Sequence, residues 1–166
     1  MINSIRLSEY VCRAHTIPFI KEQSLASHMG RSAMLFMFYY KQGWINIQKE
    51  DYYAILEYLL IHDLHEVEFG DIPYTTKSSC NYFQKYEKEK EGEVLKKFDV
   101  NLTSVQLRIA KFFDMLEFYL KTLDEFNMGN RHMKLIEVSE RAYNLLQDWF
   151  LELREESIFR LEYLKF

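Results

Sequence analysis

The stretch Leu60–Glu66 reads Leu-Ile-His-Asp-Leu-His-Glu, and it places ionisable side chains where a helix should bury apolar surface. The preceding residues form an apolar stripe at helical spacing: Tyr52, Ile55, Leu56 and Leu59. Continuing this stripe by three to four residues leads to His62, Asp63 and Glu66. Burying such groups costs several kcal/mol each unless a partner offsets the cost. A divalent cation is a suitable partner because it binds neutral imidazole and ionised carboxylate together, so the stretch predicts a metal site.

The rest of the chain predicts long helices. Only 5 Gly and 2 Pro interrupt 166 residues, which favours helices over many short strands. Ser24 is an expected helix N-cap, as is Ser78 or Ser79, and Thr103 with Gln106 three residues later reads as a capping box. We expect helices over residues 3–12, 24–42, 49–64, 78–97, 103–126 and 131–155. The predicted fold class is therefore all-α, as a single-domain helical bundle over residues 1–166.

Composition excludes several classes of function. The net charge of -4 argues against a nucleic-acid polymer as partner, because such a protein needs a basic face. The longest apolar run, residues 34–40, is too short to span a bilayer, and the N-terminal segment has no signal-peptide core. Cys12 and Cys80 form no CxxC motif and fit a reducing compartment. We expect a cytoplasmic protein, and its 12 Tyr and 13 Phe favour a homo-oligomer.

Four candidate metal ligands come from three separate predicted helices. They are His28, His62, Asp63 and Asp114, and each lies on or next to an apolar face. Helical bundles build metal sites in this way, from side chains of facing helices. Two imidazoles and two carboxylates suit Zn, Co, Mn or Fe, with Mg possible for a polyphosphate substrate, and they leave coordination positions open. An open position permits catalysis, because a bound metal acidifies water and polarises a phosphoryl oxygen.

These residues resemble the H…HD…D signature of the HD-domain metal-dependent phosphohydrolases. The segment Leu25–His28 and the HDxxE…GDxP block at residues 62–73 resemble the bacterial 5′-deoxynucleotidase branch of that family. Arg13 lies fifteen residues before His28, and Lys111 lies three residues before Asp114, as in that branch. The small phage dATP triphosphohydrolases resemble the same branch. The match covers roughly residues 6–130 and implies the all-α HD-domain fold.

The resemblance also implies a role for each matched residue. The metal ligands would be His28, His62, Asp63 and Asp114. Glu66 would act as general acid/base, and Asp71 would accept a hydrogen bond from the sugar 3′-hydroxyl, which favours deoxynucleotides. The cations that neutralise phosphate oxygens would be Arg13, Lys77 and Lys111.

Other positions are expected to lie outside the ligand set or depart from the family pattern. His15, His65 and His132 are not expected to bind the metal, and a continuing helix would turn His65 away from the face of His62 and Glu66.

Several relatives carry a tryptophan after the arginine, whereas Ala14 follows Arg13 here. The base preference is therefore open, with His15, Ile17 or Phe19 as alternative walls of a base pocket.

Several functions remain open at this stage. The favoured reaction converts a deoxynucleoside triphosphate, dATP above all, to nucleoside and triphosphate. A phage-encoded enzyme of this kind would deplete dATP in the host cytoplasm. The alternative reaction releases phosphate from a deoxynucleoside monophosphate. A different class of function is a non-catalytic HD module that binds a nucleotide for regulation. A di-iron oxygenase is disfavoured, since no additional histidines have suitable spacing for a second iron.

Overall fold

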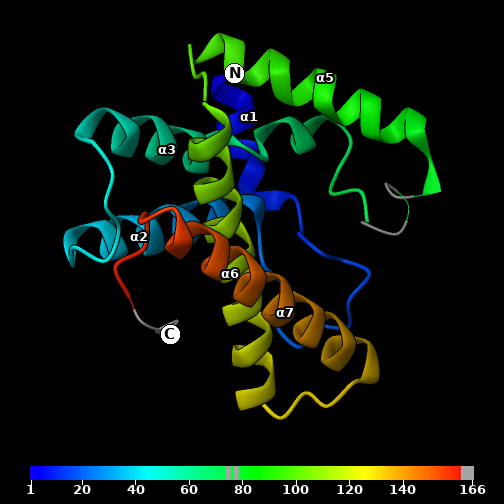
Figure 1. Ribbon diagram of the computed structural model, residues 1–166. Helices are drawn as coiled ribbons and strands as arrows, with labels where there is room; N and C mark the ends of the chain where they lie inside the picture. The colour runs from blue at the N-terminus through cyan, green and yellow to red at the C-terminus, as the bar shows by residue number, and fades with distance from the viewer. Residues whose placement is uncertain (74–75, 77–78, 162–166) are drawn as a thin grey trace.

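Helix α6 (Ser104–Asn127) runs through the centre of the molecule (Figure 1). It packs against α2 (Leu25–Lys41), α3 (Lys49–Ile61) and α7 (Met133–Glu155), while α2 also packs against α3. The computed structural model describes residues 1–73, 76 and 79–161. The remaining elements in this part of the chain are α1 (Ile2–Leu7), α5 (Asn81–Lys97) and two 3-10 helices, η1 (Ser8–Tyr10) and η2 (Leu64–Glu68).

The all-α prediction is confirmed. Within the described residues, extended pairing is limited to two isolated bridges, Cys12 with Ser24 and Ile45 with Phe159. None of the described helices has the length and apolar character needed to cross a membrane.

Capping residues fix the beginnings of the two helices that carry most of the site. The Ser24 hydroxyl accepts a hydrogen bond from the Ser27 amide at 3.2 Å and begins α2 as predicted. Thr103 and Gln106 form the predicted capping box at the start of α6, where each side chain accepts from the other residue's amide. These caps set the register of both helices, and so the faces that carry His28 and Asp114.

Two predicted boundaries are wrong. The helix expected over residues 49–64 ends at Ile61, because the chain tightens into η2, where the Glu66 amide donates to the Asp63 carbonyl at 2.9 Å. The apolar spacing of a 3-10 turn resembles that of an α-helix too closely to separate the two by pattern. The helix expected from residue 78 begins at Asn81, since the backbone of Cys80 is extended. Ser78 lies outside the described residues.

Aromatic side chains form a packed core next to the residues that carry His28 and Asp114. Phe36 on α2 and Phe113 on α6 are fully buried, and their ring centroids lie 5.3 Å apart. Phe112 packs against Phe159 of the C-terminal segment at 4.9 Å. Phe36 lies eight residues after His28, and Phe113 is adjacent to Asp114, so the packing that fixes these rings also fixes the two polar side chains.

Candidate metal centre

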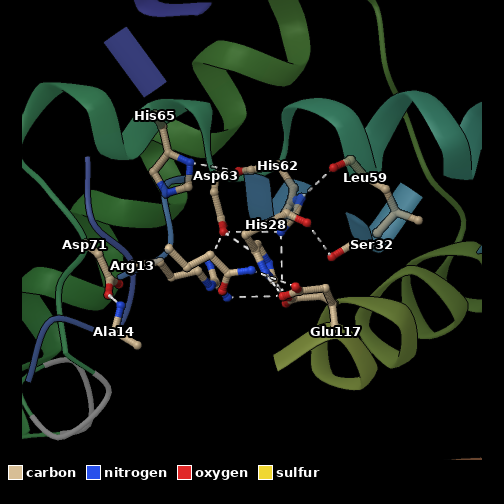
Figure 2. Close-up of polar contacts among 12 residues, drawn as sticks. Arg13, Ala14, His28, Ser32, Leu59, His62, Asp63, His65, Asp71 and Glu117 are labelled. Carbon is tan, nitrogen blue, oxygen red and sulfur yellow. Dashed lines mark hydrogen bonds and ion pairs between the residues drawn. The ribbon is translucent and has the colours of Figure 1, made fainter. Parts of the chain in front are cut away.

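The structure brings the four predicted ligands together from three helices. His28 comes from α2, His62 is the C-cap of α3, Asp63 follows it, and Asp114 comes from α6. Figure 2 shows His28, His62 and Asp63 facing one another. The Nε2 atom of His62 lies 3.3 Å from Asp63 Oδ2 and 3.7 Å from Asp114 Oδ1, and His28 Nε2 lies 3.8 Å from Asp63 Oδ2. His28, His62 and Asp63 each offer an atom within 4.8 Å of the others.

These separations fit ligands that share one ion. Two atoms that are each about 2.1 Å from an ion lie roughly 3.0–4.2 Å apart, depending on the angle between them. The three separations given above fall inside this range. The fourth, between His28 Nε2 and Asp114 Oδ1, is 2.8 Å, slightly shorter.

His62 is held in the form that binds a metal. Its Nδ1–H donates to the Leu59 carbonyl at 3.0 Å, which leaves the lone pair on Nε2. That Nε2 atom is buried and has no hydrogen-bond partner among the described residues. Burial lowers the pKa of His62, and this effect is larger than the opposite effect of the nearby Asp114 carboxylate, which raises the pKa. The ring is therefore neutral at pH 7. A lone pair that faces carboxylate oxygens is unfavourable by itself, and a cation between them removes the conflict.

His28 is oriented by a carboxylate that the sequence analysis did not identify. Its Nδ1–H donates to Glu117 Oε2 at 2.5 Å, so Nε2 faces Asp114. Glu117 is almost fully buried, and its other oxygen accepts from the Gln23 side chain at 2.6 Å. Carboxylates commonly fix metal-binding histidines in this way. The available signal was spacing, because Glu117 lies three residues after Asp114 on the same face of α6.

Arg13 bridges the two carboxylates of the site. Its guanidinium donates to Asp63 (Figure 2) and, at 3.1 Å, to Asp114. Burial would lower the pKa of Arg13, but the surrounding carboxylates, Asp114 and Glu66 foremost, raise it above its ordinary value. Burial would likewise raise the pKa of Asp114, but Arg13 and the contacts with His28 and His62 hold it well below the usual carboxyl range. The site therefore carries ionised carboxylates at neutral pH.

Of the other predicted site residues, two lie close to Arg13. The Asp71 carboxylate accepts from the Ala14 amide at 2.5 Å (Figure 2), and this ties the turn after η2 to the Arg13 loop. Ala14 has a positive φ of 53°, which turns its amide toward Asp71. Glu66, in η2, is almost fully buried, and its charge reaches Arg13.

Of the two predicted lysines, Lys111 is not brought to this site. Lys111 is exposed and lines a separate cavity of about 200 Å³ between α6 and α7, together with Trp149 and Glu152. No described contact joins Lys111 to Arg13 or to the metal residues. Three-residue spacing from Asp114 predicts a shared face, but the side of α6 that carries Lys111 lies beside α7. Lys77 lies outside the described residues.

A cavity of about 370 Å³ adjoins Arg13 and Asp71. Its apolar wall comes from the Arg13 loop, α6 and α7 and comprises Ile17, Met115, Phe118, Val138, Ala142 and Leu145. Lys134 and Arg141 add positive charge to the lining. An apolar cavity with a few charged groups in its lining suits an organic ligand that carries an anionic part. Of the suggested base walls, Ile17 lines this cavity.

Comparisons with known proteins identify the fold and the family. A family model of the HD domain matches residues 10–153. The cyanophage S-2L HD phosphohydrolase DatZ, solved bound to dA and one catalytic Zn²⁺ ion, superimposes with a TM-score of 0.74 at 16% identity, over 95% of this chain and 96% of that one. No curated protein sequence matches the chain.

Two further structures share the fold. An HD-domain phosphohydrolase from Listeria innocua matches with a TM-score of 0.66 at 17% identity, over 95% of this chain and 85% of that one. A conserved hypothetical protein from Pyrococcus furiosus matches with a TM-score of 0.64 at 21% identity, over 93% and 95% of the two chains. Because the family model covers most of the sequence, this chain belongs to the HD-domain family.

Proposed function

We propose that this protein is a metal-dependent hydrolase of deoxynucleotides, with dATP as the favoured substrate and deoxynucleoside and triphosphate as products. The observation that carries the proposal is the position of the 370 Å³ cavity, which shares Arg13 and Asp71 with the surroundings of the metal residues. A nucleoside in this cavity would have its 5′-phosphate beside the imidazoles and carboxylates. The similarity in fold and length to the phage enzyme bound to dA supports a purine deoxynucleoside.

The metal residues would be His28, His62, Asp63 and Asp114, with Zn, Co or Mn as the ion that fits the donor set. A bound ion of this kind would acidify a water molecule and polarise the phosphoryl group. Glu66 would accept the proton of the attacking water and return a proton to the leaving 5′-oxygen. Its burial and its electrostatic contact with Arg13 support this role.

Arg13 would bind phosphate oxygens beside an ion held by Asp63 and Asp114. A guanidinium has five N–H donors, and the contacts with these two carboxylates leave donors for a phosphate. Lys77 and Lys111 stay predictions as further phosphate ligands, and for Lys111 the exposed position offers no support. Lys134 and Arg141, which line the cavity, would add positive charge around a bound nucleotide.

Asp71 would bind the 3′-hydroxyl of the sugar. A carboxylate has about four acceptor positions, so the bond from the Ala14 amide leaves room for the 3′-hydroxyl. The expected result is faster hydrolysis of dATP than of 2′,3′-dideoxy-ATP, which lacks the 3′-hydroxyl, measured as kcat/KM, and a smaller ratio in Asp71→Ala. Equal rates for both nucleotides in the unaltered protein would contradict this role.

The direct test is to incubate the protein with Co²⁺ and either dATP or dAMP and to identify the phosphate product by ³¹P NMR. We expect triphosphate from dATP, and no product with Asp63→Ala. The matched control is Asp124→Asn, an exposed carboxylate on α6. Orthophosphate from dAMP, with dATP untouched, would favour the monophosphate alternative, which a single arginine at the site suits. Nucleotide binding without turnover would identify a regulatory module.

Self-association is a further prediction. Met34, Met37 and Phe38 are exposed on α2, where they form an apolar surface. Sedimentation velocity should give a mass above that of the 20.2 kDa chain, and a monomer at micromolar concentration would contradict the prediction.

A further inference from the structure

A second group of metal-binding side chains lies beside the first, at the contact between η2 and α5. It consists of His65 and Glu66 from η2 and Glu87 from α5, whose ligand atoms lie within 4.8 Å of one another. His65 and Glu66 are buried and Glu87 is half-buried, so this is not an exposed acidic patch. A continuous α-helix would turn His65 away from Glu66, but the chain forms the 3-10 helix η2 here instead.

His65 repeats the arrangement of His62. Its Nδ1–H donates to the His62 carbonyl at 2.8 Å, just as His62 donates to Leu59, three residues earlier (Figure 2). The lone pair of His65 is therefore on Nε2. This atom is buried, its side chain is 4% exposed, and it has no hydrogen-bond partner among the described residues.

The position of Nε2 distinguishes a metal ligand from half of an ion pair. It lies 3.9 Å from Glu87 Oε1, beyond hydrogen-bond distance. A protonated imidazole beside a carboxylate normally closes to about 2.8 Å. Two ligands of one ion lie roughly 3.0–4.2 Å apart, and the observed separation falls in this range.

We propose that His65, Glu66 and Glu87 form a second divalent-cation site. One imidazole nitrogen and two carboxylates select a borderline ion such as Mn²⁺, Co²⁺ or Zn²⁺ and leave positions open for water or phosphate oxygens. Binding through one oxygen of Glu66 leaves the other oxygen for proton transfer. The inference rests on the geometry of these three residues and does not require the proposed deoxynucleotide hydrolysis.

The test counts ions without any nucleotide. Chelator-treated protein is dialysed against Co²⁺, and bound cobalt per chain is measured by elemental analysis. We expect two ions in the unaltered protein, one in His65→Gln, one in His28→Gln and none in the double variant. Circular dichroism establishes that each variant is folded.

Glu87→Gln is a second variant that tests the site. Because Glu87 is only half-buried, this substitution should disturb folding less than a change at His65. It should also reduce the count from two to one, whereas Glu89→Gln, on the exposed side of the same helix, should retain two. A single ion in the unaltered protein, or two ions in both His65→Gln and Glu87→Gln, would overturn the second site. Because no substrate is present, neither result depends on whether deoxynucleotides are hydrolysed.

Discussion

Glu117 contacts the candidate metal centre through His28. Its carboxylate fixes the imidazole through Nδ1, and Gln23 in turn holds the carboxylate. A neutral amide of the same shape would accept a weaker hydrogen bond and would make the imidazole a poorer ligand.

We therefore expect Glu117→Gln to weaken Co²⁺ binding at the centre by roughly 10–100-fold while the protein stays folded. Titration of chelator-treated protein, followed by visible absorption of Co²⁺, measures the change. Asp124→Asn, an exposed carboxylate on the same helix, serves as the control and should not change the affinity. An unaltered affinity in Glu117→Gln would show that His28 needs no such support.

At the scale of elements, a buried ion pair on α6 holds the loop that follows Arg13. Lys121 donates to Glu125 at 2.6 Å and to the Lys21 carbonyl at 2.6 Å. The Glu125 carboxylate also accepts from the amides of Ile20 and Lys21. The loop is thus attached to α6 by backbone hydrogen bonds, and α6 positions the cavity wall as well as Asp114.

The ion pair between Lys121 and Glu125 makes the free energy of unfolding depend on pH in the acidic range. Burial would raise the pKa of Glu125, but hydrogen bonds from Lys121, Asn130 and two backbone amides lower it to about 2. Between pH 2 and the ordinary carboxyl pKa of 4.5, the unfolded chain binds the extra proton. The stabilisation, on the order of 3 kcal/mol, is complete above pH 4.5 and is lost as pH falls toward 2.

Glu125→Gln should destabilise the protein by about 3 kcal/mol at pH 7, because Lys121 would remain buried without its counter-charge. The free energy of unfolding in urea, measured at pH 7 and pH 3, should then fall less on acidification than in the unaltered protein. Parallel losses in the two proteins would contradict the assignment.

The capping box of α6 offers a separate test of helix register. Thr103→Ala removes the acceptor of the Gln106 amide and should cost about 1 kcal/mol of unfolding free energy. Ser104→Ala, one residue into the helix and exposed, should change stability by less than about 0.5 kcal/mol in the same urea experiment. Equal effects of the two substitutions would refute the cap.

At the scale of the whole molecule, the metal centre joins α2, α6 and the end of α3. An ion that binds only the folded chain should stabilise it by about 2.7 kcal/mol at a concentration of 100 times Kd. Chelation should therefore lower Tm by roughly 5–10 °C, as measured by differential scanning calorimetry. Asp63→Ala should show a much smaller response, and an equal response would place the stabilising ion elsewhere.

Some features could be predicted from the sequence because local chemistry determines them. The all-α class follows from the scarcity of Gly and Pro, and the beginnings of α2 and α6 follow from Ser24 and Thr103. The family resemblance was carried by His28, the His62-Asp63 pair and Asp114.

Other features depend on packing that the sequence pattern does not encode. The end of α3 at Ile61 could not be seen, because apolar residues continue into η2. Glu117 was missed since an acidic residue in an amphipathic helix is usually solvated, and only the approach of α2 buries it. Lys111 is on the same helix as Asp114, but its neighbours come from α7, and the sequence pattern does not show where α7 packs.

The central claim is that three helices direct His28, His62, Asp63 and Asp114 to one ion. Anomalous diffraction from crystals grown with Zn²⁺ tests it most directly. We expect an anomalous peak about 2.0–2.2 Å from Nε2 of both histidines and from a carboxylate oxygen of Asp63 and of Asp114. Absence of a peak there, with the Arg13 guanidinium still between the two carboxylates, would contradict it.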